Sequence, residues 1–373
     1  MLKKRILSFL GAAAVTAALT FAVVSVSPSN GFTSGSLQEG MSYDTCGVSP
    51  DAVVASVDGN GATADLITYW IGYNATYLNS YMQYYGGGAL DWDYVMSDGT
   101  AMPDYVKNDV LTTVKQELVI ENLAEKYGVE LTDEQLSAME SDEQGFIEQY
   151  GGEEGFDAEL AKLGLRRETY ERITRTNYLY QDLYKLYLTE GSALYASNED
   201  LAAYAAAQGY ITADHILLTT VDTATGEALS DEQKAEKKAL AEELAEKLKN
   251  YTGDDLASYF AELADEYSED PGRASNPTGY TFTTGSMVQE FEDAAYALDE
   301  GAVSDIVESK FGYHILLRLP LDKTAAAETV REDYFSNFID EQMDKAKTAT
   351  SAEYDKLDAK ALYEAIVAAQ AEG

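Results

Sequence analysis

The chain has 373 residues, a formal net charge of −39, two histidines and a single cysteine. The acidic excess disfavours nucleic acid and anionic membrane surfaces, which both attract basic proteins, and favours basic partners. One cysteine excludes an internal disulfide, and so few His and Cys residues offer no zinc-ligand cluster, so we expect no metal and no cofactor.

The first 27 residues predict an export signal. Lys3, Lys4 and Arg5 precede an apolar run over residues 6–26. About 20 apolar residues suffice to cross a bilayer, so a cleaved signal peptide and an uncleaved membrane anchor both stay open. The basic residues would remain inside, which leaves the rest extracytoplasmic, secreted or anchored to the outer face of the membrane by this segment alone. Cys46 lies too far beyond the run for a lipoprotein.

A linker and a helical region are expected next. Residues 28–50 are rich in Ser, Gly and Pro and lack periodicity, which predicts a flexible linker. Val53–Val57 predicts a short strand that runs into a turn at Asp58-Gly59. Helical periodicity follows, which indicates the N-terminal part of a helical lobe over 51–208, with helices at about 62–85, 104–127, 132–148, 155–164 and 167–190.

From residue 209 the pattern changes to mixed strands and helices. A strand at 210–219 precedes two helices, a short strand near 280–282, a helix opened by a capping box of Ser286 with Gln289, and two final strands, about 303–307 and 313–319. This predicts a compact α+β domain over 209–320, with a small antiparallel-type sheet and surrounding helices.

The C-terminal residues 321–373 form amphipathic helical patterns without a core of their own. We therefore expect them to pack on the first helical lobe. The α+β domain is then an insertion in an all-α domain built from the N- and C-terminal segments.

The two histidines open the same four-residue word, His215-Ile216-Leu217-Leu218 and His314-Ile315-Leu316-Leu317. Side chains alternate between the faces of a strand, so each His shares a face with the Leu two residues on. If the two strands pair, the imidazoles can meet. A single His in an apolar strand is more often a hydrogen-bonded core residue, but the duplication favours a site.

Four motifs in order carry a family resemblance: Ala213–Leu217, Tyr267–Asp270, Met287–Ala295 and Phe311–Ile315. Residues 210–319 resemble the parvulin family of peptidyl-prolyl cis/trans isomerases. The export signal and flanking helices are similar to the layout of PrsA- and SurA-type extracytoplasmic foldases, which carry a parvulin domain on a helical chaperone lobe.

The resemblance implies roles for six residues. His215, Asp270 and His314 match the polar network of the family, as catalytic residues that orient and polarise the site. Phe282, Met287 and Phe291 match the walls of its proline slot. No nucleophile is expected, because Ser268 and Ser309 show no partner arrangement in the sequence.

The expected function is a peptidyl-prolyl isomerase and foldase for unfolded exported polypeptides that contain Xaa-Pro bonds. The alternative is a non-enzymatic holdase with a degenerate, peptide-binding parvulin domain. Asn276-Pro277 stands where many parvulins have Gly-Gly, which keeps the alternative open. Residues 219–231 contain no Lys or Arg, so a preference for phosphorylated substrates is not expected. The oligomeric state, a dimer included, stays open.

One helix face is aromatic. Tyr69, Tyr73, Tyr77 and Tyr81 follow one another at spacings of four. Tyrosine offers a large amphipathic contact area, so this face could bind clients. Helical spacing slightly favours the other interpretation, a seam against the C-terminal helices.

Overall fold

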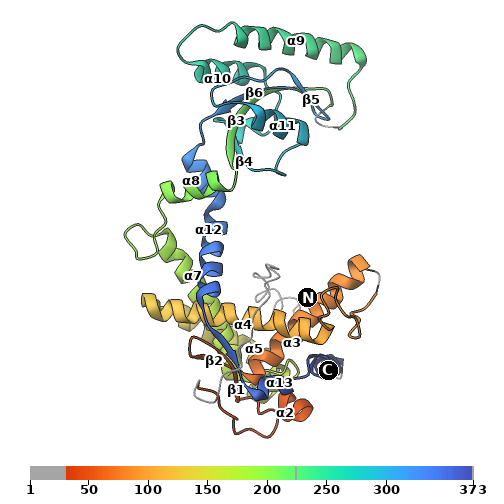
Figure 1. Ribbon diagram of the computed structural model, residues 1–373, viewed down its shortest axis with the longest axis vertical. Helices are drawn as coiled ribbons and strands as arrows, with labels where there is room; N and C mark the ends of the chain where they lie inside the picture. The colour runs from red at the N-terminus through yellow and green to blue at the C-terminus, as the bar shows by residue number, and fades with distance from the viewer. Residues whose placement is uncertain (1–30, 87, 223–224, 372–373) are drawn as a thin grey trace. The chain divides into compact units, whose positions relative to one another are not determined.

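A computed structural model describes residues 31–86, 88–222 and 225–371. The expected export signal over residues 1–27 lies outside them. The chain forms two compact units (Figure 1). The described residues up to Tyr195 and those from Asn337 onward make the first unit, and Ala196–Ser336 make the second. The second unit is thus an insertion in the first, and it is longer at both ends than the predicted 209–320.

The first unit is mainly helical. Its helices are α2 (Met41–Cys46), α3 (Ala64–Tyr81) with the π-helical turn η1 (Met82–Gly86), α4 (Met102–Tyr127), α5 (Asp133–Gln149), α6 (Glu153–Ala161), α7 (Arg167–Leu188), α13 (Ala352–Lys356) and α14 (Ala359–Ala371). Helix α14 packs on α2, α3 and α4. The C-terminal segment therefore completes the core of the lobe.

The lobe also contains a small sheet that the sequence analysis did not predict, so it is not all-α. Strands β1 (Val53–Val57), β2 (Asn60–Thr63) and β7 (Thr348–Thr350) pair in the order β2-β1-β7, all antiparallel. Asp58 and Gly59 join β1 to β2 with φ of 50° and 93°, the left-handed pair that a two-residue hairpin requires. The predicted turn is therefore a hairpin, and α3 begins at Ala64 instead of residue 62.

The segment expected to be a flexible linker is packed where the structure describes it. Ser42 and Val48 are buried, and α2 contacts α14. The Asp51 carboxylate accepts hydrogen bonds from the backbone N–H groups of Ser36 and Leu37, at 2.9 and 3.2 Å. A Ser- and Gly-rich segment without periodicity can be held in this way, since its polar backbone is satisfied by a side chain from the adjoining domain.

The second unit is an α+β domain. It consists of α8 (Asn198–Ala207), β3 (Ile211–Thr219), α9 (Asp231–Lys249), α10 (Leu256–Tyr267), the 3₁₀ turn η2 (Arg273–Ser275), β4 (Tyr280–Phe282), α11 (Gln289–Ala297), β5 (Val307–Ser309), β6 (Gly312–Leu319) and the first part of α12 (Lys323–Lys345). The fold class, α+β, agrees with the prediction.

Its four strands form an antiparallel sheet in the order β4-β3-β6-β5. The central pair runs in register from Thr212 opposite Leu319 to Thr219 opposite Gly312. Helices α9 and α10 cover one face and α11 the other (Figure 1). Because both faces of the central pair are covered, β3 is buried along its whole length.

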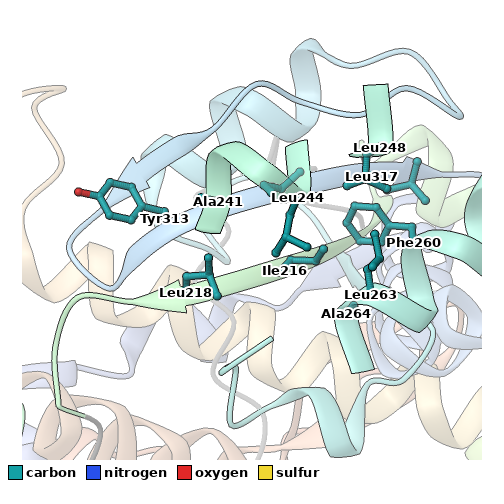
Figure 2. Close-up of a cluster of buried hydrophobic side chains, with 11 residues drawn as sticks. Ile216, Leu218, Ala241, Leu244, Leu248, Phe260, Leu263, Ala264, Tyr313 and Leu317 are labelled. Atoms are coloured by element: carbon teal, nitrogen blue, oxygen red, sulfur yellow. The ribbon is translucent and has the colours of Figure 1, made fainter. Parts of the chain in front are cut away.

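The main core of this domain lies between the sheet and α9 and α10. Figure 2 shows Ile216 and Leu218 of β3 facing Leu244 of α9 and Phe260 of α10. Alternate residues of β3 and β6 point away from this core, toward α11. The histidines belong to this second set, and the apolar core on the first face holds the strands that carry them.

Every helix within the described ranges is too short or too polar to cross a membrane.

Candidate active site

The two histidines lie side by side on the sheet. His215 of β3 is opposite Leu316 of β6, and His314 of β6 is opposite Leu217 of β3. The two rings are therefore diagonal neighbours on one face, with centroids 5.3 Å apart. Both side chains are buried. A period-two pattern in two adjacent antiparallel strands is sufficient to bring them together.

Asp270 meets the first of these histidines. Its Oδ2 lies 3.1 Å from His215 Nε2 and accepts a 2.5 Å hydrogen bond from the Tyr280 hydroxyl. Its Oδ1 accepts from the Gly272 N–H at 3.0 Å. These hydrogen bonds, that of His215 first, hold the pKa of the Asp270 carboxyl well below its ordinary value. The group is a carboxylate at neutral pH.

The loop that carries Asp270 is tied to β3. The Glu269 N–H donates to the Leu217 carbonyl at 2.7 Å, and the Leu217 N–H donates to Ser268 Oγ at 3.1 Å. The backbone of β3 at Leu217, past the end of its pairing with β4, is thus hydrogen-bonded to this loop. Asp270 lies three residues after the end of α10, and these bonds place it beside His215.

The hydrogen bonds assign the ring protons. If His215 donates its Nε2–H to the Asp270 carboxylate, its Nδ1 in the neutral ring carries a lone pair. Ser309 Oγ accepts from the Phe311 N–H at 3.1 Å and lies 2.7 Å from His314 Nε2. The hydroxyl can donate to that nitrogen, which places the His314 proton on Nδ1. The rings then have opposite tautomers, and the described residues supply no hydrogen-bond partner to either Nδ1.

His314 is neutral over the physiological range. Burial, and secondarily the neighbouring His215, lower its pKa to about 4. Its contact with Ser309 corrects the expectation that this serine has no partner. The contact does not create a nucleophile, because the imidazole that would accept the serine proton has too low a basicity at this pKa.

An aromatic wall stands beside the polar network. The Phe291 ring lies 5.1 Å from that of His215, 5.7 Å from that of His314 and 5.6 Å from that of Phe282, centroid to centroid. Phe282 and Phe291 are buried, and Met287 is half-buried against the same cluster. The three predicted slot residues thus lie together next to the three predicted polar ones.

The start of α11 differs from the prediction. Ser286 and Gln289 form no capping box, and α11 begins at Gln289 after Val288. The Glu292 carboxylate instead accepts from the N–H groups of Gly285 and Met287, at 3.0 and 2.8 Å. Met287 consequently precedes the helix, held by a carboxylate from its first turn.

Tyr280 is a member of the site that the sequence analysis missed. Burial, and secondarily the hydrogen bond to Asp270, raises the pKa of its phenol, so the proton stays on Tyr280. Its position depends on a turn in which the Gly279 N–H donates to the Asn276 carbonyl at 3.1 Å. Gly279 has φ of 90°, and a Cβ there would lie 2.8 Å from the Ala213 carbonyl oxygen. The Asn276-Pro277 segment therefore delivers Tyr280 to the carboxylate.

A buried ion pair between Arg273 and Asp214 lies next to the site. Arg273 Nη1 donates to Asp214 Oδ1 at 2.7 Å, and its Nε donates to Asp265 at 2.9 Å. Asp214 Oδ1 also accepts from the His215 N–H at 2.8 Å. Burial raises the pKa of Asp214 despite the adjacent guanidinium. The pair joins the loop after Asp270 to the strand that carries His215.

The described residues contain no group of three or more His, Cys, Asp or Glu side chains that could hold a metal ion.

The comparisons with known proteins bear on this geometry. Residues 215–319 match the family model "Rotamase: PPIC-type PPIASE domain". A foldase protein PrsA from Geobacillus is 38% identical over 122 residues, which is 32% of this chain and 42% of that protein. A foldase protein PrsA from Staphylococcus aureus is 26% identical over 68% of this chain and 71% of its own.

Two solved structures are also among the matches. The crystal structure of PrsA from Bacillus subtilis is 20% identical, with coverage of 87% of this chain and 93% of its own and a TM-score of 0.25. The solution structure of NmPin, the parvulin of Nitrosopumilus maritimus, is 36% identical over 30% of this chain and 96% of its own, with a TM-score of 0.21.

The family match covers the same residues as the histidine pair, the carboxylate and the aromatic wall. Residues 215–319 are a parvulin-type peptidyl-prolyl cis/trans isomerase domain. The chain is similar to PrsA foldases, and it spans 42% of the Geobacillus protein and 71% of the Staphylococcus aureus one. The non-enzymatic alternative is not favoured.

Proposed function

We propose that this protein accelerates cis/trans exchange of Xaa-Pro bonds in unfolded exported polypeptides at the site formed by His215, Asp270, His314 and Phe291. The observation that carries the proposal is the contact of a buried histidine pair with both a carboxylate and an aromatic wall. The family match over the same residues supports the reaction class.

The reaction needs little chemistry from the protein. Rotation about an Xaa-Pro bond crosses a barrier of about 18–20 kcal/mol, and no covalent bond forms or breaks. A catalyst must bind the twisted amide more tightly than either planar isomer. An apolar slot for the pyrrolidine ring and a preorganised polar surface for the amide are sufficient.

In this assignment Phe282, Met287 and Phe291 hold the proline ring. Asp270 reaches the slot through His215, whose ring contacts Phe291, and it is kept ionised by its three donors. It supplies a fixed negative potential that discriminates between the planar and the twisted amide. The histidines orient that carboxylate and do not transfer protons.

The substrate and the location follow from the rest of the chain. The N-terminal pattern predicts export, with or without retention as a membrane anchor, and the exported part would carry a net charge of −42 after loss of the three basic signal residues. We infer that the substrates are extended polypeptides outside the cytoplasm. The helical unit would hold them while the isomerase domain acts.

The test is measurement of cis/trans exchange rates for a panel of Xaa-Pro peptides by NMR exchange spectroscopy. Asp270→Asn and Phe291→Ala are each expected to lower kcat/KM by roughly tenfold or more, since one removes a charged hydrogen-bond acceptor and the other a wall of the slot. Circular dichroism establishes that both variants remain folded.

Glu262→Ala is the matched control for loss of a carboxylate, because Glu262 is exposed on α10. It should retain wild-type rates. Peptide binding without any acceleration of exchange in the wild type would instead establish the holdase.

A further inference from the structure

The ion pair of Asp214 with Arg273 lies in the interior of the isomerase domain. The two side chains are 5% and 10% exposed, and Arg273 Nη1 lies 2.7 Å from Asp214 Oδ1. Removing two charges from water costs about as much as their attraction returns, so a buried pair adds little stability by itself. Apolar side chains of similar volume would fill the same space at least as well. The stability of the domain therefore does not explain the pair.

Asp214 holds the strand at His215. Leu316, opposite His215 in β6, bonds through both its N–H and its carbonyl to Ser304, so the His215 N–H points away from β6. It donates to Asp214 Oδ1 at 2.8 Å, at a point where β4 no longer pairs with β3. The same oxygen accepts from Arg273 Nη1. The backbone that presents the His215 ring is thereby tied to the guanidinium.

Arg273 closes the turn that carries Asp270. Its N–H donates to the Asp270 carbonyl at 3.2 Å, and the Gly272 N–H donates to Asp270 Oδ1 at 3.0 Å. These two bonds fix both the backbone and the carboxylate of Asp270 within one β-turn. The position of Arg273 therefore determines where the Asp270 carboxylate lies.

The Arg273 side chain is also anchored to α10. Its Nε donates to Asp265 Oδ1 at 2.9 Å, and its Nη2 donates to the Ala261 carbonyl at 3.3 Å. With Asp214 on Nη1, each nitrogen of the planar guanidinium has an acceptor. A lysine ammonium is a point charge on a flexible stem and cannot bond to strand and helix in these fixed directions. The guanidinium is thus held between β3 and α10.

These contacts form a closed ring around the site. Asp270 Oδ2 lies 3.1 Å from His215 Nε2, and the His215 N–H is bonded to Asp214. Asp214 is paired with Arg273, whose N–H returns to the Asp270 carbonyl. A shift of the ion pair must therefore change the contact between the Asp270 carboxylate and the His215 ring. The cluster that walls the proline slot is made of other residues.

We propose that Asp214 and Arg273 are positioning residues of the isomerase, which set the distance between the Asp270 carboxylate and the His215 ring. The proposal rests on the proposed function and adds to the same site two residues that act through others. A fixed charge favours the twisted amide only if it is held in place before the substrate binds. Misplacement by about 1 Å can lower a rate by as much as about a hundredfold.

The experiment replaces the pair by apolar side chains in the full chain, as Asp214→Val/Arg273→Met, and measures both cis/trans exchange of an Xaa-Pro peptide and unfolding in urea. The double variant should be about as stable as the wild type, because two buried charges are removed together. Its kcat/KM should fall roughly tenfold, mainly through kcat, since the slot is left intact. A pair with a structural role alone would leave activity to follow stability.

Nitrogen-15 labelling of histidine gives a readout that is independent of activity. The chain has two histidines, so the imidazole signals can be assigned with one variant, His314→Gln. The Nε2–H of His215, bonded to the Asp270 carboxylate, should give a downfield proton signal that moves upfield in the double variant. A wild type that does not accelerate exchange counts against the proposed function, whereas an unchanged His215 signal counts against the positioning role.

Arg273→Lys covers the case in which the double variant does not fold. It keeps a charge beside Asp214 but not the fork, so kcat/KM should fall roughly threefold, with a smaller shift of the same signal. Glu121→Leu/Arg172→Met is the matched control, because it removes an ion pair of the helical unit, in which Arg172 Nη2 lies 2.6 Å from Glu121 Oε2. Its exchange rates on a short Xaa-Pro peptide should equal those of the wild type.

Any one of three outcomes overturns the proposal: wild-type kcat/KM in the folded Asp214→Val/Arg273→Met variant, an unchanged His215 signal in that variant, or an equal loss of rate in the control. If the double variant is unfolded, the first two are measured on Arg273→Lys instead.

Discussion

Removal of the Tyr280 hydroxyl tests how the carboxylate of the isomerase site is held. The phenol donates a 2.5 Å hydrogen bond to ionised Asp270, one of three donors on that side chain. Hydrogen bonds to charged groups contribute about 1.5–3 kcal/mol. Tyr280 is only half-buried, so we expect the lower part of this range for Tyr280→Phe.

The sign of the effect follows from linkage. The pKa of Asp270 is lowered by folding, so its contribution to stability is present above the ordinary Asp pKa and is lost as pH falls through the folded pKa. Without the phenol, the folded pKa moves up toward its ordinary value. The variant is therefore less stable than the wild type at neutral pH, by about 1.5 kcal/mol, and the difference shrinks in acid.

The activity should change in the same direction. At pH 7 the carboxylate stays ionised but is oriented by two donors instead of three, so we expect kcat/KM to fall about three- to tenfold, the equivalent of about 0.6–1.4 kcal/mol. The acid limb of the pH–rate profile should move to higher pH. KM should change less than kcat, because Tyr280→Phe removes only the hydroxyl that donates to Asp270 and keeps the ring that packs against the cluster of Phe282 and Phe291.

The assay is NMR exchange spectroscopy on an Xaa-Pro peptide between pH 3 and pH 8, with urea unfolding at pH 7 and pH 4. Tyr251→Phe is the matched control, since its phenol donates to a neutral carbonyl, that of Asp255. Unchanged kcat/KM and unchanged stability of Tyr280→Phe at pH 7, or a loss of rate shared by the control, would refute the reasoning.

Three further predictions concern stability. Folding lowers the pKa of His314 to about 4, so its contribution to stability is complete above pH 6.5 and is lost as pH falls toward 4. In urea unfolding, the stability of His314→Gln should therefore change by about 2 kcal/mol less between pH 4.5 and 7.5 than that of the wild type. An equal change in both proteins would contradict this. Burial raises the pKa of Glu117 to about 8, so the stability of the protein falls as pH rises from 4.5 to 8. Glu117→Gln should reduce this fall and have a higher Tm than the wild type at pH 8.5. The gain in Tm should be absent at pH 4.5. Gly312 has φ of 148°, and a Cβ there would lie 2.1 Å from the Leu218 carbonyl oxygen. Gly312→Ala should therefore lower the free energy of unfolding by about 2–4 kcal/mol in chemical denaturation. Gly226→Ala, where the space is open, should lower it by about 1 kcal/mol.

Local patterns were enough for the strands of the site. Period-two alternation in the two histidine words predicted the strands at 210–219 and 313–319, and the structure has them at Ile211–Thr219 and Gly312–Leu319. Ser230 and Gln233, three positions apart, likewise form a capping box at the start of α9. These features depend on residues within a few positions of one another, which is why a sequence alone reveals them.

Contacts that no periodicity marks escaped the same reasoning. Ser309 meets His314 across the tight turn between β5 and β6, and Tyr280 meets Asp270 across an irregular loop. Strand β7 has only three residues between two helices and exists because β1 pairs with it. None of these has a periodicity, so no local signal distinguishes them from an ordinary loop.

The row of tyrosines on α3 marks the division most clearly. Spacing by four determined that Tyr69 and Tyr77 share a helix face, since that follows from the geometry of an α-helix alone. Whether each position of the row is core or surface was decided by the segments that pack on α3, among them α4 and, from the far end of the chain, α14. Sequence thus determined the class of fold, the histidine strands and, through family resemblance, the reaction. The tertiary structure decided the partners of each polar group and the exposed surfaces, because both depend on segments that the chain brings together only when it folds.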